Sequence, residues 1–253
     1  MGLRNGLFCG LLAIAACSSP QEEQLLEGPL EGAGIVFVSE QPSGFALDPP
    51  SADARALQEG AELVYRRGGD RIARLRVERD AELGFLRLID TDTGLQTLHS
   101  LDLVEVGRDA PRQDGEEGAV NLPLLRLLPG DPWLLFPMWQ GKEWVAEFAS
   151  HAPGREPILL RVEYHCDARE MVTTPAGTFS CLRVWRAAGL AREGSELRRT
   201  SLYWYAPELG FVVRRLDDGQ LLELEAILTA EEAAVERAAA GEAAATTEGE
   251  VGA

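Results

Sequence analysis

Histidine is the side chain that most often acts as a general base at neutral pH, and the chain contains only three, His99, His151 and His165. None belongs to a catalytic pattern, because the sequence lacks a G-x-S-x-G elbow, an H-E-x-x-H helix, a Walker loop and a dinucleotide-binding glycine pattern. His165 falls on the polar face of a predicted strand, where we expect it to be solvated. The histidines therefore do not indicate a hydrolase or a metal enzyme.

Acidic residues also provide no recognisable site. Residues 90–94, Asp-Thr-Asp-Thr-Gly, imitate the start of a calcium-binding loop, but position 12 of that loop would be Leu101 instead of a bidentate glutamate. We therefore predict a hairpin turn there. The paired carboxylates of a glycoside hydrolase meet only in three dimensions, so none of the 41 acidic residues is nominated. The sequence predicts no catalytic residue, no metal ligand and no cofactor.

The amino terminus has the layout of a secretory signal peptide over residues 1–16. Arg4 precedes a short apolar segment that small residues follow, and this segment is too short to span a bilayer stably. Its end, Ile-Ala-Ala-Cys at residues 14–17, resembles the lipobox of bacterial lipoproteins. The resemblance implies cleavage before Cys17 and acylation of that cysteine. A serine in the next position, Ser18, resembles the pattern of lipoproteins that are sorted to the outer membrane. An ordinary signal peptide with a chance cysteine is the alternative.

Charge and composition restrict the partners. The 253 residues carry 24 Lys and Arg against 41 Asp and Glu, a net charge of −17, which argues against nucleic-acid binding. We expect a cell-envelope protein, anchored to the outer membrane by the acyl group on Cys17, with its domain in the periplasm or facing outside. A lipid or a protein is the remaining candidate partner.

Cys166 and Cys181 remain as the candidates for a disulfide, because the lipobox resemblance implies that Cys9 is removed with the signal peptide and that Cys17 is lipidated. An oxidising compartment favours pairing. A regular hairpin with its tip at residues 175–177 places the two cysteines several residues out of register, which exceeds the reach of a disulfide. The sequence leaves this pairing open.

The middle of the chain has the pattern of antiparallel β structure. Residues 17–33 read as a tether, and many short apolar segments between turn residues follow from 34 to 228. We predict one curved antiparallel sheet or half-barrel, with a division into two domains near the acidic loop 107–119 as the alternative. The predicted strands are 35–39, 62–67, 71–79, 83–90, 95–106, 158–166, 178–187, 200–206, 210–216 and 220–228.

The carboxyl-terminal residues 229–253 have a different pattern. Thr229 and Glu232 form a capping box, which predicts the start of a short helix. The alanine-rich residues that follow favour a helix with few groups to bury. We expect residues 241–253 to be disordered.

All five tryptophans fall within one stretch of the β region, at positions 133, 139, 144, 185 and 204. Aromatic side chains pack well on the pleated surface of a sheet, so one interpretation is a filled core. The other is a surface for an apolar ligand or a protein partner, formed by Trp133, Trp139, Trp144, Trp185 and Trp204. The sequence leaves both interpretations open.

Three motifs in the same stretch resemble the TapB-like group of secreted bacterial β domains. They are F-P-M-W-Q-G-K-E-W at 136–144, V-T-T-P-A-G-T-F at 172–179 and Y-W-Y-A-P-E-L-G-F-V at 203–212. The resemblance covers about residues 120–228 and implies a curved antiparallel sheet. It supplies no catalytic residues.

A non-catalytic binding or assembly role agrees best with an anchor, a tether, a β domain and no catalytic constellation. A structural envelope protein and a carbohydrate-active hydrolase are the alternatives.

We predict that Cys17→Ser removes lipid labelling. Cells that express the chain are fed a palmitate analogue, and the wild-type protein should carry the label because its cysteine is acylated. Label that persists in the variant would contradict a lipid anchor at this residue.

Overall fold

The computed structural model describes residues 33–40, 46–51, 54–69, 71–80, 84–111, 121–192 and 198–239. The predicted signal peptide, Cys17, the tether up to residue 32 and the tail beyond residue 239 lie outside the described residues. The strands are β1 (Gly34–Val38), β2 (Glu62–Arg67), β3 (Arg71–Asp80), β4 (Phe85–Asp90), β5 (Gln96–Ser100), β6 (Glu105–Ala110), β7 (Leu122–Asp131), β8 (Glu143–His151), β9 (Ile158–Thr174), β10 (Gly177–Leu190), β11 (Arg198–Ala206), β12 (Phe211–Asp217) and β13 (Gln220–Leu228), with a 3-10 helix at Arg55–Leu57.

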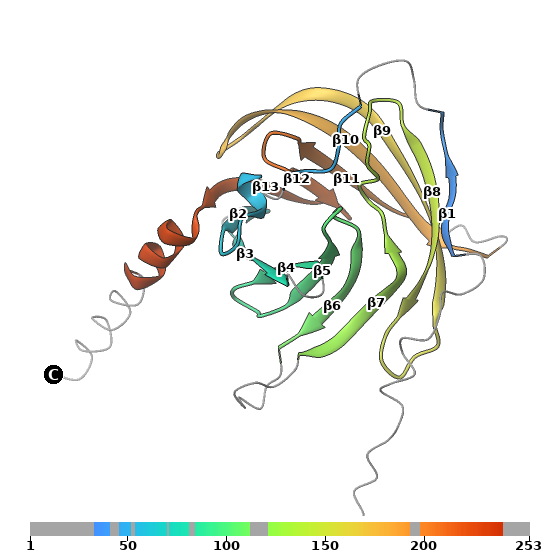
Figure 1. Cartoon of the computed structure of the whole chain (residues 1–253), viewed down its shortest axis with the longest axis horizontal. Helices are drawn as coiled ribbons and strands as arrows, with labels where there is room; N and C mark the ends of the chain where they lie inside the picture. Colours follow the sequence, from blue (N-terminus) through green and yellow to red (C-terminus); the bar gives the residue numbers. More distant parts are fainter. Residues whose placement is uncertain are drawn as a thin grey trace, which may run out of the picture.

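The strands form one antiparallel sheet in which most sequence neighbours are also neighbours in space (Figure 1). Its order runs β1-β8-β7-β6-β5-β4-β3-β2-β13-β12-β11-β10-β9. β8 also pairs with β9, from Glu143 opposite His165 to Ser150 opposite Ile158. This pairing joins the ends of the sheet, so β2 to β13 close into a barrel of twelve strands, with β1 added along the edge of β8.

The expected curved sheet or half-barrel is therefore wrong. The sequence pattern did not predict β7 and β8, and these are the strands that complete the ring. A half-barrel leaves two edges with unpaired backbone groups, whereas closure pairs those groups within the sheet. Closure also turns one face of every strand toward a shared interior.

Several hairpins confirm the turns predicted from the sequence. Asp218 and Gly219, between β12 and β13, have φ angles of +48° and +77°, the left-handed pair that a tight Asp-Gly turn requires. Asp90 accepts hydrogen bonds from the backbone of Asp92 and Thr93, so residues 90–94 form a turn, as predicted. The predicted strand 95–106 is instead two strands, β5 and β6, separated by a turn.

The connection between β7 and β8 folds into the core. Leu134 and Met138 are buried within it, and the backbone of Met138 pairs with that of Leu47. Lys142, the only lysine of the chain, is 2% exposed at the end of this connection. Its ammonium group donates hydrogen bonds to the carbonyls of Leu135 and Pro137, at 2.5 and 2.8 Å. Burial lowers the Lys142 pKa to about 8.

The predicted helix covers residues 230–239, and its capping box is confirmed. The Thr229 hydroxyl accepts from the Glu232 backbone at 3.2 Å, and the Glu232 carboxylate accepts from the Thr229 backbone at 2.8 Å. The helix buries Ala233, and Arg237 pairs with the buried Glu62 of β2. Among the described residues, no helix has the length and apolar character needed to cross a membrane.

We predict that Trp144→Ala lowers the free energy of unfolding by about 3–5 kcal/mol, the usual cost of removing a large buried aromatic side chain. Trp144 of β8 is fully buried and stacks on Tyr164 of β9, with ring centroids 5.0 Å apart, at the closure of the barrel. Urea unfolding measures the change. The control is Met171→Ala, since Met171 is 67% exposed, and it should shift stability by less than about 0.5 kcal/mol.

The lowered pKa of Lys142 predicts a pH-dependent effect of Lys142→Met. Between about pH 8 and the ordinary lysine pKa of 10.5, the unfolded chain binds the proton that the folded chain has released, so wild-type stability rises with pH across this range. The variant lacks this gain. Its destabilisation relative to wild type, measured by urea unfolding, should be larger at pH 10 than at pH 7, and an equal loss at both values would contradict the assignment.

Candidate functional site

The barrel interior contains two adjoining pockets of about 460 and 600 Å³. We call the smaller one the Arg186 pocket and the larger one the Trp133 pocket, because Arg186 lines only the smaller pocket and Trp133 lines only the larger one. Both volumes fall within the range of small-molecule sites, roughly 300–1,000 Å³. The two pockets share a set of lining residues that we call the charged belt, which comprises Glu105, Arg108, Asp131, Arg199, Tyr203, Arg215 and Asp217.

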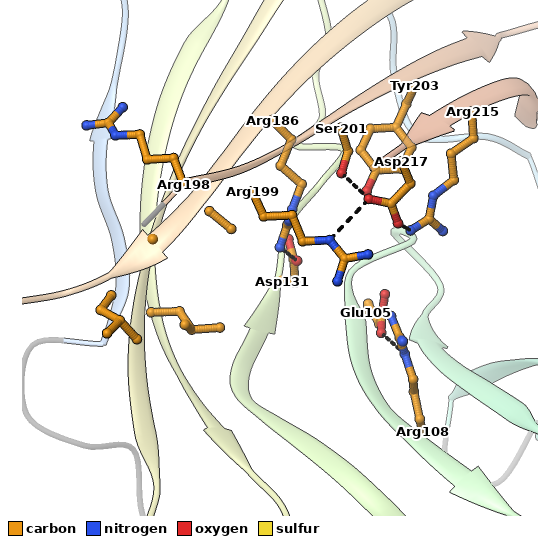
Figure 2. Close-up of a pocket in the computed structure, with 14 residues that line it drawn as sticks. Glu105, Arg108, Asp131, Arg186, Arg198, Arg199, Ser201, Tyr203, Arg215 and Asp217 are labelled. Atoms are coloured by element: carbon orange, nitrogen blue, oxygen red, sulfur yellow. Dashed lines mark hydrogen bonds and ion pairs between the residues drawn. The ribbon is translucent and has the colours of Figure 1, made fainter. Parts of the chain in front are cut away.

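Strand alternation explains why the belt points inward. Side chains at every second position of a strand share one face of the sheet. On β11 this places Arg199, Ser201 and Tyr203 on the same inward face, and on β12 it does the same for Arg215 and Asp217. Figure 2 shows these side chains converging from the two neighbouring strands.

Carboxylates and guanidinium groups pair within the belt (Figure 2). Asp217 accepts hydrogen bonds from the Ser201 hydroxyl at 2.8 Å and from Arg215 at 2.7 Å. Arg199 lies 3.4 Å from the same carboxylate. On β6, Arg108 donates to Glu105 at 2.7 Å. Each carboxylate of this group therefore has a cationic partner, which is what burial of charge requires.

Asp131, at the end of β7, connects the belt to the barrel closure. It accepts a hydrogen bond from the Tyr164 hydroxyl at 2.5 Å and one from Arg186 at 2.6 Å. These partners come from β9 and β10, so three strands converge on one carboxylate. Arg198 also lines the Arg186 pocket, but it points away from this group and pairs with Glu163 at 2.8 Å (Figure 2).

Neighbouring groups keep three residues of the belt, Glu105, Asp217 and Arg215, ionised. Burial opposes the charges of Glu105 and Asp217, but Arg108 lowers the Glu105 pKa, while Ser201 and Arg215 lower that of Asp217, both below their ordinary values. Burial also opposes the charge of Arg215, whose pKa is nevertheless raised by Tyr203 and Asp217. At neutral pH Glu105, Asp217 and Arg215 are thus charged.

The Trp133 pocket also has an apolar wall, which lies beside the belt residue Tyr203. The Trp133 ring lies 5.1 Å from Tyr203 and 6.1 Å from Phe211, measured between ring centroids. Leu88 and the buried His99 line the same pocket. Burial lowers the His99 pKa, so this imidazole is neutral at pH 7. The pocket therefore combines charged groups with a hydrocarbon surface.

Of the five tryptophans singled out in the sequence, Trp133 alone lines either of these two pockets. Trp139 and Trp144 are buried around Lys142, whose ammonium group lies 4.5 and 5.7 Å from their rings. The remaining two lie on β10 and β11. Trp204 is buried and donates to Glu170 at 2.5 Å, while Trp185 alternates with the pocket residue Arg186 and so faces outward. Trp139, Trp144 and Trp204 are thus buried and line neither of the two pockets.

The candidate disulfide does not form in the structure, where Cys166 and Cys181 are both buried and free. On the paired strands β9 and β10, Cys166 lies opposite Val184 and Cys181 lies opposite Glu170. The two thiols are therefore offset along the strands, in the manner that the hairpin register predicted. Burial raises the pKa of each thiol to about 12, which makes both unreactive.

Sequence reasoning missed every member of the charged belt. A signal was present on β11, where Arg199, Ser201 and Tyr203 place hydrogen-bonding side chains at every second position and therefore on one face of the strand. Charged residues on a strand normally indicate its solvent face, and only the closed ring makes this face an interior. The acceptors on the belt are already engaged, so the arrangement suits binding more than proton transfer. Among the described residues, no group of His, Cys, Asp and Glu could hold a metal ion.

No family model matches the chain, and no curated protein matches it, so the resemblance to the TapB-like group stays a prediction. Among solved structures, it is similar to the hypothetical lipoprotein YmcC of Escherichia coli, with 10% identity, a TM-score of 0.44 and coverage of 68% of this chain and 88% of that one. It is also similar to a Bacteroides fragilis protein described as exported with a YmcC-like fold, with 17% identity, a TM-score of 0.36 and coverage of 73% of this chain and 100% of that one. A Parabacteroides distasonis protein described as a lipoprotein has 13% identity, a TM-score of 0.37 and coverage of 73% of this chain and 99% of that one.

Proposed function

We propose that this protein is a non-catalytic binding protein of the bacterial envelope, and that its barrel holds a small ligand with an apolar part. The observation that carries the proposal is the interior cavity, in which the charged belt lies beside the apolar wall of Trp133 and Phe211. The charged groups can fix the orientation of a ligand, and the apolar wall can cover a hydrocarbon part of it.

A glycoside hydrolase is less well supported. Such an enzyme needs one carboxyl group that stays protonated to act as general acid, which requires a raised pKa. The pKa values of Glu105 and Asp217 are instead lowered, and Asp131 already accepts from both Tyr164 and Arg186. These carboxylates suit the role of fixed partners for arginine.

The proposal includes the anchor inferred from the sequence. Cleavage before Cys17 and acylation of that residue would attach the barrel to the outer membrane, in the periplasm or facing outside. The tether of residues 17–33 leads directly into β1, so the barrel would lie close to a lipid surface from which an apolar ligand can come.

We predict that Ala73→Phe weakens ligand binding at least about tenfold, equivalent to about 1.4 kcal/mol. Ala73 of β3 is buried and lines the Trp133 pocket, so a phenyl ring there occupies space that the ligand needs. The chain 18–253, which retains every described residue, is titrated with the neutral fluorescent probe N-phenyl-1-naphthylamine.

Ile72→Phe is the matched control, because Ile72 is adjacent on the same strand but 41% exposed. It should bind the probe like the wild type. Circular dichroism and the unfolding midpoint verify that both variants are folded. Equal binding by the folded Ala73→Phe variant, or no binding by the wild type, would reject the interior as the binding site.

A further inference from the structure

Unpartnered hydrogen-bonding groups concentrate at the cavity. The described residues contain six buried side-chain nitrogen or oxygen atoms without a hydrogen-bond partner in the protein. Four belong to residues that line the two pockets, namely His99 Nδ1, Trp133 Nε1, Arg186 Nε and Arg215 Nε. The Arg186 pocket, which both of these arginines line, has five arginines against three carboxylates in its wall, an excess of positive charge that an anionic group would balance.

The missing partners are acceptors. An indole N–H and a guanidinium N–H can only donate, so three of the four atoms require an oxygen or another acceptor. The nearby carboxylates are already engaged, since Asp131 accepts from Tyr164 and Arg186, while Asp217 accepts from Ser201 and Arg215. Arg186 and Arg215 each have guanidinium N–H donors beyond the one that pairs with these carboxylates.

The excess of donors discriminates between kinds of ligand. A sugar or an alcohol brings a donor with each hydroxyl, and an amine brings donors alone. A carboxylate or phosphate group brings only acceptors, and its geometry matches the planar fork of arginine. The belt thus favours an anionic head group over a neutral or cationic one.

The second part of the ligand follows from the apolar wall. Trp133, Phe211 and Leu88 present aromatic and aliphatic surface in the pocket that adjoins the belt. A small inorganic anion would leave this surface in contact with water. A head group at the belt that carries a hydrocarbon tail would cover it, and burial of apolar area is favourable.

We propose that the cavity binds an anionic amphiphile, a single hydrocarbon chain with a carboxylate or phosphate head, with the head at Arg186 and Arg215 and the chain against Trp133 and Phe211. This assignment rests on the proposed function, because it names the chemical class of the ligand for the same cavity.

The test compares ligands of one chain length on the chain 18–253. Dodecanoate, dodecyl phosphate, dodecanol and dodecylamine are each tested, below their micelle concentrations, for displacement of N-phenyl-1-naphthylamine. An oligogalacturonate is tested in the same way as an acidic sugar without a hydrocarbon tail. At least one of the two anions should bind about tenfold more tightly than dodecanol, and dodecylamine no better than dodecanol. The preference between the two anions identifies a fatty-acid or a phosphate head.

Three other outcomes have different meanings. Equal affinity for dodecanol and both anions overturns the anionic head but leaves the binding function intact. Binding of oligogalacturonate with no alkyl ligand overturns the amphiphile and makes the ligand an acidic saccharide. Failure of the probe and of every ligand to bind rejects the proposed function itself.

Variants locate the head group. Arg186→Gln should reduce the preference for the anion over dodecanol at least fivefold, because it removes the charge that the head group contacts. Arg161→Gln is the matched control, since Arg161 pairs with Glu147 and lines neither pocket, and its preference should stay at the wild-type value. Arg215→Gln serves as a second variant if Arg186→Gln unfolds. If either variant is folded and keeps the wild-type preference for the anion, the proposed position of the head group is wrong. The wild-type ligand series decides the ligand class in either case.

Discussion

The pairing of β8 with β9 joins the two ends of the sheet, and the interior exists only because of it. Its register sets Trp144 against Tyr164, two buried rings that stack across the closure. The Tyr164 hydroxyl in turn donates to Asp131, which accepts from Arg186. A single strand pairing therefore connects backbone closure, core packing and the charged groups of the cavity.

Closure also explains why charged residues occupy the interior. In an open sheet, Arg215 and Asp217 would face water, and their pairing would contribute little. Inside the ring the same groups are partly withdrawn from water, and each carboxylate needs a cationic partner to remain charged. The arginines that provide these partners retain further donors, on which the proposed preference for an anionic ligand rests. The proposed binding chemistry would thus be a consequence of how the barrel stabilises its own charges.

The two strands that the sequence pattern missed are those that decide the architecture. β7 contains Pro123 and Pro129, and proline normally argues against a central strand because it cannot donate to the ladder. β8 does alternate, with Trp144, Ala146 and Phe148 buried, but its outward positions mix apolar and charged residues and blur the pattern. By contrast, the Asp-Gly turn, the hairpin at residues 175–177 and the capping box depend on a few adjacent residues, and all three formed as predicted.

Local sequence by itself determined the antiparallel β class, most strands, the tight turns and the start of the carboxyl-terminal helix, because each depends on residues close together in the chain. Only the tertiary structure decided that the sheet closes, that Trp133 alone of the tryptophans lines either of the two pockets, and that Arg186 and Arg215 meet in one cavity. The physical reason is that alternation along a strand separates its two faces without indicating which one becomes an interior. That choice depends on the pairing of β8 and β9, and no local pattern encodes it.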